Sequence, residues 1–113
     1  MNIHSFTKGI DFEENRIQTK VVVETSFSKE IQILLGKGQM MKEHKAPFPI
    51  LIHIVEGEIE FGIKGTSQLM TTGDIIALEA DVQHDLKANK NTIVRLTLSK
   101  HDHAARVEKA IES

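Results

Sequence analysis

The sequence predicts an all-β domain built as an antiparallel sandwich or barrel. Three observations favour this class: apolar and polar residues alternate over short runs, turn residues separate these runs, and helix signals are scarce. Alternation with a period of two is typical of a strand with one buried face. We therefore expect many short strands around one core.

The predicted barrel covers residues 20–99 and follows an N-terminal arm, residues 1–19, which shows no convincing period and has room for one strand at most. Three runs alternate most clearly. Their expected inward residues are Ile31, Ile33 and Leu35 in "EIQILLG", Ile59, Phe61 and Ile63 in "EGEIEFGI", and Val94, Leu96 and Leu98 in "TIVRLTLS".

Turns are predicted where glycine interrupts these runs. Lys64 and Gly65 form the centre of a tight hairpin, because glycine tolerates the positive φ that such turns need. A second turn is expected at "TTGD", residues 71–74. Helix is predicted for residues 100–112, where good helix formers follow a weak capping box. The apolar stripe of this helix is narrow, so we expect it to lie on the barrel rather than inside it.

Composition limits the functional classes. The 113 residues suit one domain, 1–113, with 40% apolar and 27% charged residues. No signal peptide or membrane-spanning run is apparent, and cysteine is absent, so we expect no disulfide, no thiolate zinc site and a cytoplasmic location. A net charge of −2 and the lack of tyrosine and tryptophan argue against nucleic-acid binding.

Gly38, His44 and Gly57 form one short pattern, and Gly73 with His84 forms a second. Together they resemble the two motifs of a small single-domain cupin. The first cupin motif runs from a glycine through His-x-His to a closing glycine, and Gly38, His44 and Gly57 stand at these positions. The second begins at Gly73 and reaches its histidine at His84. The resemblance covers residues 30 to 100. It implies a cupin antiparallel β-barrel, also called a jelly roll or double-stranded β-helix, with a short C-terminal helix.

The resemblance also implies where a metal would bind, and there the sequence departs from the family. Metal-bearing cupins hold one divalent ion at positions that correspond to His44, Ala46, Ile50 and His84. Alanine and isoleucine have no donor atom. We therefore expect either no metal or a weakly held iron, manganese, zinc or nickel ion on His44 and His84, with water, Glu43 or Gln39 as further ligands.

The other histidines are assigned by parity and position. His84 shares a strand face with Leu86 and Ala88, so it is expected to point inward. His53 alternates with Ile52 and Ile54, so we expect it to face outward, under a partner subunit or a terminal segment. His4, His101 and His103 are expected at the solvated surface.

The predicted ligand pocket consists of these two motif histidines and nearby apolar side chains: His44, His84, Met40, Phe48, Ile50 and Ile52. A pocket of this composition fits a small, mostly apolar or carboxylated ligand. The first hypothesis is thus a binding module without a complete metal centre. The alternative is a metal-dependent cupin enzyme of the dioxygenase or isomerase type, and a purely structural or partner-binding domain stays open. A metal-free sugar epimerase is set aside because the chain has no tyrosine.

Strand "ILIHIV", residues 50–55, is apolar on both faces. Its outer side would leave an apolar patch on a monomer. Together with the pairing of small cupins as dimers, this predicts a homodimer.

Overall fold

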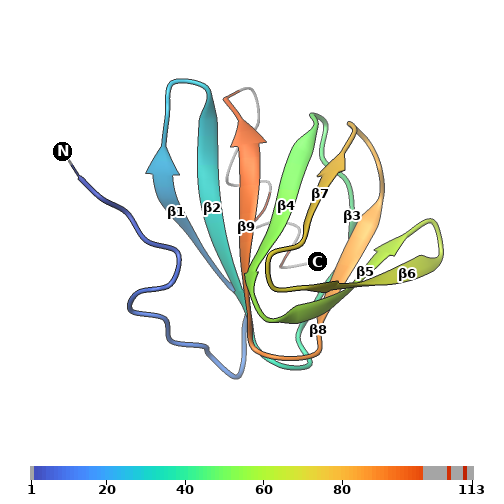
Figure 1. Cartoon of the computed structure of the whole chain (residues 1–113). Coiled ribbons are helices and arrows are strands. Elements are labelled where there is room, and N and C mark those ends of the chain that lie inside the picture. Colours follow the sequence, from blue (N-terminus) through green and yellow to red (C-terminus); the bar gives the residue numbers. More distant parts are fainter. Residues whose placement is uncertain (1, 101–106, 108–110, 112–113) are drawn as a thin grey trace.

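The structure is a computed structural model that describes residues 2–100 together with Val107 and Ile111 (Figure 1). Within these residues it has nine strands: β1 Gln18–Glu24, β2 Ser28–Leu35, β3 Met40–His44, β4 Ile50–Glu56, β5 Glu58–Ile63, β6 Thr66–Thr71, β7 Ile75–Leu78, β8 His84–Ala88 and β9 Thr92–Ser99. The predicted all-β class is confirmed. The predicted C-terminal helix lies outside the described residues except at Val107 and Ile111, which are helical.

The strands form two antiparallel sheets that pack face to face. One has five strands in the order β1-β2-β9-β4-β7, and the other has four in the order β3-β8-β5-β6. Consecutive strands therefore change sheets at several places, as Figure 1 shows for β4 and β5. No helix in the described part of the chain is long and apolar enough to cross a bilayer.

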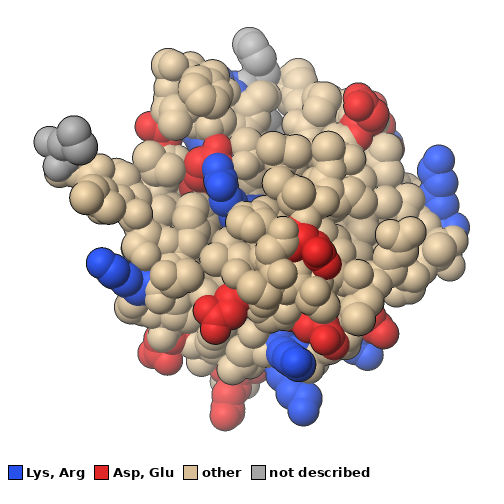
Figure 2. Space-filling model, viewed as in Figure 1, with Lys and Arg blue, Asp and Glu red and all other residues tan. Residues whose placement is uncertain are grey.

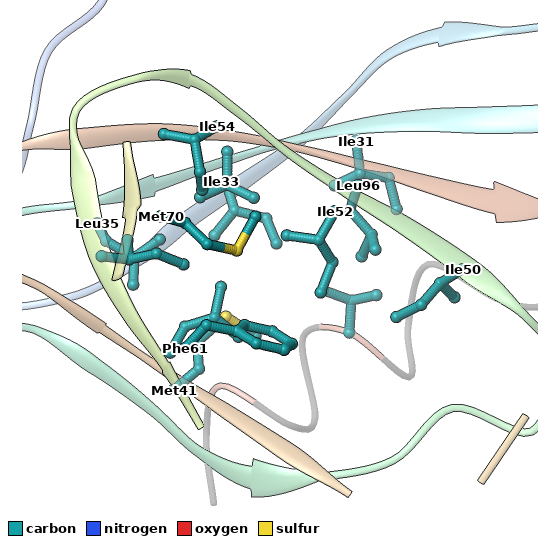
Figure 3. Packing of buried hydrophobic residues seen from close by; sticks show 14 of the residues in the cluster. Ile31, Ile33, Leu35, Met41, Ile50, Ile52, Ile54, Phe61, Met70 and Leu96 are labelled. Atoms are coloured by element: carbon teal, nitrogen blue, oxygen red, sulfur yellow. The ribbon is translucent and has the colours of Figure 1, made fainter. Parts of the chain in front are cut away.

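The core lies between the two sheets, and it is built from the residues that the alternation assigns inward. Ile31, Leu35 and Ile59 are at most 1% exposed, and so are their counterparts Val94 and Leu98 on β9. Figure 3 shows Ile31 and Leu35 in the same cluster as Phe61, Met41 and Met70, between the layers. A side-chain period of two therefore correctly predicts which face each of these strands buries.

Both glycine turns occur where they are predicted. Lys64 and Gly65 connect β5 to β6 with positive φ at both residues, 52° and 78°. This is the conformation of a two-residue hairpin whose twist matches that of its strands. Gly73, with a φ of 92°, turns the chain between β6 and β7.

The N-terminal arm, residues 2–17, carries no strand and lies along the outer face of β2. Gln32 Nε2 donates to the Phe6 carbonyl at 3.1 Å, and Gln39 Nε2 donates to the Glu13 carbonyl at 3.0 Å. The Arg95 guanidinium lies 5.8 Å from the centre of the Phe6 ring. The contacts of Phe6 with Gln32 of β2 and Arg95 of β9 help to explain why β2 is buried on its outer face as well as toward the core.

A buried carboxylate lies on the outer face of β2. Glu30 is 6% exposed and accepts hydrogen bonds from Ser28 Oγ at 2.7 Å, Arg95 Nε at 2.9 Å and Thr97 Oγ1 at 2.5 Å. Burial alone raises the pKa of a carboxyl group. Here the hydrogen bonds from Thr97, Ser28 and Arg95 stabilise the charged form and hold the pKa of Glu30 below its usual value.

Glu30→Gln is expected to lower the free energy of unfolding by about 2 kcal/mol at neutral pH, because hydrogen bonds to a charged acceptor are replaced by weaker ones. Since the folded-state pKa is depressed, this contribution is present above the unfolded-state pKa and is lost as pH falls through the folded-state pKa. Urea unfolding of both proteins should show the full difference at about pH 7 and a shrinking one below about pH 4. A difference that does not change with pH would contradict the assignment.

Charged side chains are spread over the surface. On the face shown in Figure 2, acidic and basic residues are interspersed and separated by wide uncharged areas. Such a distribution is what the small net charge leads one to expect.

Candidate functional site

Two imidazoles from distant parts of the sequence meet at one end of the four-stranded sheet. His44 is the last residue of β3 and His84 is the first residue of β8, and the antiparallel register pairs them directly. Their ring centroids are 4.3 Å apart and the ring planes are tilted by 58°. The structure thus brings together the two histidines that the sequence singles out, one by parity and one by motif.

Hydrogen bonds fix the orientation of both rings in the same way. His44 Nδ1 lies 2.8 Å from the Lys42 carbonyl oxygen, and His84 Nδ1 lies 2.9 Å from the Val82 carbonyl oxygen. A carbonyl oxygen can only accept, so each Nδ1 carries a proton and Nε2 is the basic nitrogen of the neutral ring. Phe61 stacks on His84, with centroids 5.7 Å apart and planes at 24°.

A cavity between the sheets joins these histidines to the core. Apart from the two imidazoles its lining is apolar: Ile33, Met41, Ile50, Ile52, Leu86, Val94, Leu96 and Val107. His84 is 2% exposed, whereas His44 is half-buried and closer to solvent. The volume of the cavity is about 20 Å³, which is room for one water molecule.

The structure places four of the six predicted pocket residues at this cavity and the other two elsewhere. His44, His84, Ile50 and Ile52 line the cavity, but Met40 and Phe48 do not. Met40 is 49% exposed because it pairs with the outward-facing Lys87. The next residue, Met41, pairs with the inward-facing Leu86 and lines the cavity in its place. Phe48 is half-buried in the loop between β3 and β4.

The C-terminal segment also contributes to this cavity. Val107, which belongs to the apolar stripe expected to face the barrel, is 2% exposed and is part of the core cluster. Its side chain lines the same cavity as the two histidines. Ile111 packs more loosely against this cluster.

The described residues around the two imidazoles do not make up a metal-binding donor set. Ala46 and Ile50, at two of the four positions that hold metal in cupins, are both buried and have no donor. Gln39 is also not available, since its side chain binds Gly36 N at 2.6 Å and the arm. Glu43 is exposed, on the strand face opposite His44. Among the residues that the structure describes, no three His, Cys, Asp or Glu side chains gather to hold an ion.

The remaining histidines lie away from this cavity or outside the described residues. His53 is half-buried on the outer face of the five-stranded sheet, between Ile75 of β7 and Arg95 of β9. The outward orientation that parity predicts for it is correct. His4 is exposed on the arm, as expected, and His101 and His103 fall outside the described residues.

A larger and more open groove lies outside the barrel, and no pattern in the sequence predicts it. It has a volume of about 980 Å³ and runs between the N-terminal arm and strands β1 and β2. Its lining mixes cationic and anionic side chains: Lys8, Arg16 and Lys20 with Asp11 and Glu14. Ile111 reaches one edge of it.

Comparison with known proteins identifies the fold. No protein-family model matches the sequence, and no curated protein is significantly similar to it. Solved structures do match. An RmlC-like cupin from Desulfovibrio desulfuricans is 22% identical with a TM-score of 0.79, and the match covers 88% of this chain and 96% of that one.

Two other structures give the same result. An RmlC-like cupin from Shewanella frigidimarina has a TM-score of 0.68 at 19% identity, covering 85% of this chain and 92% of that one. A protein from Klebsiella pneumoniae with a double-stranded β-helix domain has a TM-score of 0.73 at 19% identity, covering 88% and 89%. The chain therefore has the fold of a small cupin.

Proposed function

We propose that this protein is a binding module that holds a small organic acid inside its barrel, oriented by His44 and His84. The observation that carries the proposal is the pairing of the two imidazoles, with centroids 4.3 Å apart, at the rim of an otherwise apolar cavity. Ligand pockets typically combine an apolar lining with a few convergent polar groups of this kind.

The imidazole pair favours an acid over a neutral ligand. The Nδ1 proton of each ring is directed at a backbone carbonyl. The ring can therefore donate a hydrogen bond to a carboxylate only when Nε2 also carries a proton. Binding of a carboxylate would then take up a proton from solution and place a favourable ion pair in apolar surroundings. The other lining residues are apolar, so none of them could pair with the carboxylate in place of the protonated imidazole.

The proposal is tested by screening small carboxylic acids for a rise in melting temperature and measuring the best ligand by titration calorimetry. We expect affinity to increase as pH is lowered from about 8 to about 6, because imidazole gains its proton in this range. His84→Ala should weaken binding at least about tenfold, the magnitude of a charge-assisted hydrogen bond.

His4→Ala is the control, because His4 is exposed on the N-terminal arm and does not line the cavity. It should bind the acid like the wild type. Equal loss in both variants would contradict a site at His84. If protein purified without chelator contains stoichiometric metal, and His84→Ala loses it, the hypothesis of a metal-dependent enzyme is favoured over that of a binding module.

We further propose that the protein forms a homodimer through the outer face of β4 and β7. Leu51 is 40% exposed and Ile75 is 59% exposed, and the register places them beside Ala77 and His53 on adjacent strands. Val55 continues the same face. A patch of this kind on a two-fold axis can bury itself against its own copy.

Light scattering at micromolar concentration should give the mass of a dimer, and Ile75→Lys should shift it to the monomer. Leu69→Lys is the control, since Leu69 is also 59% exposed but lies on β6 of the other sheet. A wild-type monomer, or dissociation by both substitutions, would contradict this interface.

A further inference from the structure

The main chain just before each histidine of the pair holds its imidazole ring. The carbonyl of Lys42 accepts from His44 Nδ1, and the carbonyl of Val82 accepts from His84 Nδ1. In both cases the acceptor lies two residues before the histidine. The orientation of each ring therefore depends on the path of the main chain at that point.

Strand β3 contains a β-bulge immediately before His44. The register pairs Met41 with Leu86 and next pairs His44 with His84, so three residue steps on β3 match two on β8. In a regular strand, residues three apart face opposite sides of the sheet. The extra residue of the bulge brings the His44 side chain to the same side as Met41, and both line the cavity.

The loop before His84 contains a left-handed turn at Asp81. Its φ is 65°, and Lys64 is the only other non-glycine residue with a positive φ in the described part of the chain. Asp and Asn tolerate this conformation better than most residues with a Cβ atom. The N–H group of Asp81 donates to the carbonyl oxygen of Ala46 at 2.7 Å. Since Ala46 comes two residues after His44, this bond connects the loop before one histidine to the loop after the other.

We propose that Asp81 is a positioning residue for the imidazole pair. His44 and His84 form the last pair of the β3–β8 ladder, and the bond from Asp81 to Ala46 holds the two chains together beyond it. The same turn determines where the next residue, Val82, presents its carbonyl oxygen to His84 Nδ1. The inference rests on the proposed function and adds how its site is oriented: a loop residue fixes the ring of His84 with Nε2 as the basic nitrogen.

Asp81→Val tests the proposal, because a β-branched side chain is strongly disfavoured in the left-handed region. The turn should open and withdraw the Val82 carbonyl from His84. Long-range proton–nitrogen NMR spectra at about pH 8, where imidazole is mostly neutral, should then show a mixture of both tautomers in place of the Nδ1–H form. Affinity for acetate, measured by calorimetry at about pH 6, should fall about tenfold, since the ring must then be oriented on binding.

Two further variants separate the turn from the side chain. Asp81→Gly adopts a positive φ readily, so it should keep the wild-type tautomer and affinity. If it loses affinity as Asp81→Val does, the carboxylate matters rather than the turn, and the proposal is wrong. Asp81→Ala strains the turn less than Asp81→Val and should change both readouts in the same direction by a smaller amount. It provides the test if circular dichroism shows that Asp81→Val does not fold.

Gly73→Val is the matched control. Gly73 has a φ of 92°, lies in the turn at the other end of β7, and donates its N–H to the Ile54 carbonyl oxygen, also at 2.7 Å. Its replacement should strain that turn and lower the urea midpoint of unfolding, but it should leave the tautomer and the affinity unchanged. If Gly73→Val alters them as much as Asp81→Val, general loss of stability explains the effect and the proposal is wrong.

The NMR measurement needs no ligand, so it separates this inference from the proposed function. If Asp81→Val keeps the wild-type tautomer and affinity, Asp81 does not position the pair, and the proposed function stands. If the wild type does not bind acetate, the proposed function fails for this acid, while the tautomer of His84 in Asp81→Val decides the inference by itself.

Discussion

Gly57→Ala is expected to lower the free energy of unfolding by about 3–5 kcal/mol, through two separate costs. The φ of Gly57 is 122°, a conformation that residues with a Cβ atom rarely adopt. A Cβ atom there would also lie 2.7 Å from Thr92 Cα and 2.8 Å from the Asn91 carbonyl oxygen. Both are backbone atoms, so relief requires movement of the strand that begins at Thr92.

That strand is not free to move. Thr92 is fully buried, and its hydroxyl accepts from Glu58 N at 3.1 Å and lies 2.7 Å from the Lys90 carbonyl oxygen. Gly57 itself joins β4 of the five-stranded sheet to β5 of the four-stranded sheet. A disturbance there affects the packing of both layers.

Gly38→Ala separates the two costs. Gly38 also has a positive φ, 89°, but an added Cβ would meet no atom within 4 Å. Its replacement should therefore cost only about 1–2 kcal/mol, the backbone term alone. The measurement is urea unfolding followed by circular dichroism, with the slope checked for constancy. Equal losses in the two variants would show that contact with Thr92 contributes nothing.

The sequence could predict those strands that have one face in the core and the other face toward solvent. His84, Leu86 and Ala88 alternate with polar residues, and all three are buried as parity requires. The method fails for β3, Met40–His44, because "MMKEH" does not alternate and two prolines follow it. His44 could be placed only by its resemblance to a motif. For the same reason the sequence could not show whether Met40 or Met41 faces inward, since a shift of one residue reverses every side chain of a strand.

Val107 and the N-terminal arm show a different limit. A stripe of apolar residues indicates that one face of a helix is buried, but it does not say against which surface. Val107 lines the cavity together with residues of β2, β3, β4, β8 and β9, and this arrangement is a property of the whole barrel. The arm is held by backbone carbonyls of Phe6 and Glu13 that accept from Gln32 and Gln39. Because every residue has a carbonyl, no sequence pattern marks these contacts.

Phe61→Ala is expected to lower the free energy of unfolding by about 3–5 kcal/mol. It removes a buried aromatic ring, and the neighbouring side chains only partly fill the cavity that remains. Phe61 is 2% exposed, and the register places it between Leu86 of β8 and Gln68 of β6. Its ring also stacks on His84 at 5.7 Å. The substitution should therefore disturb the site as well as the core.

A milder pair of variants separates these two effects. Phe61→Leu keeps most of the buried volume but loses the stack, at a cost of about 1–1.5 kcal/mol. Ile59→Val, on the same face of β5 and 0% exposed, should cost about 0.5–1.5 kcal/mol. Only Phe61→Leu should shift the NMR signal of the His84 Cε1 proton, because only it removes a ring current, and only it should weaken binding of an acid. If both variants move that signal equally, the stack with Phe61 does not orient His84.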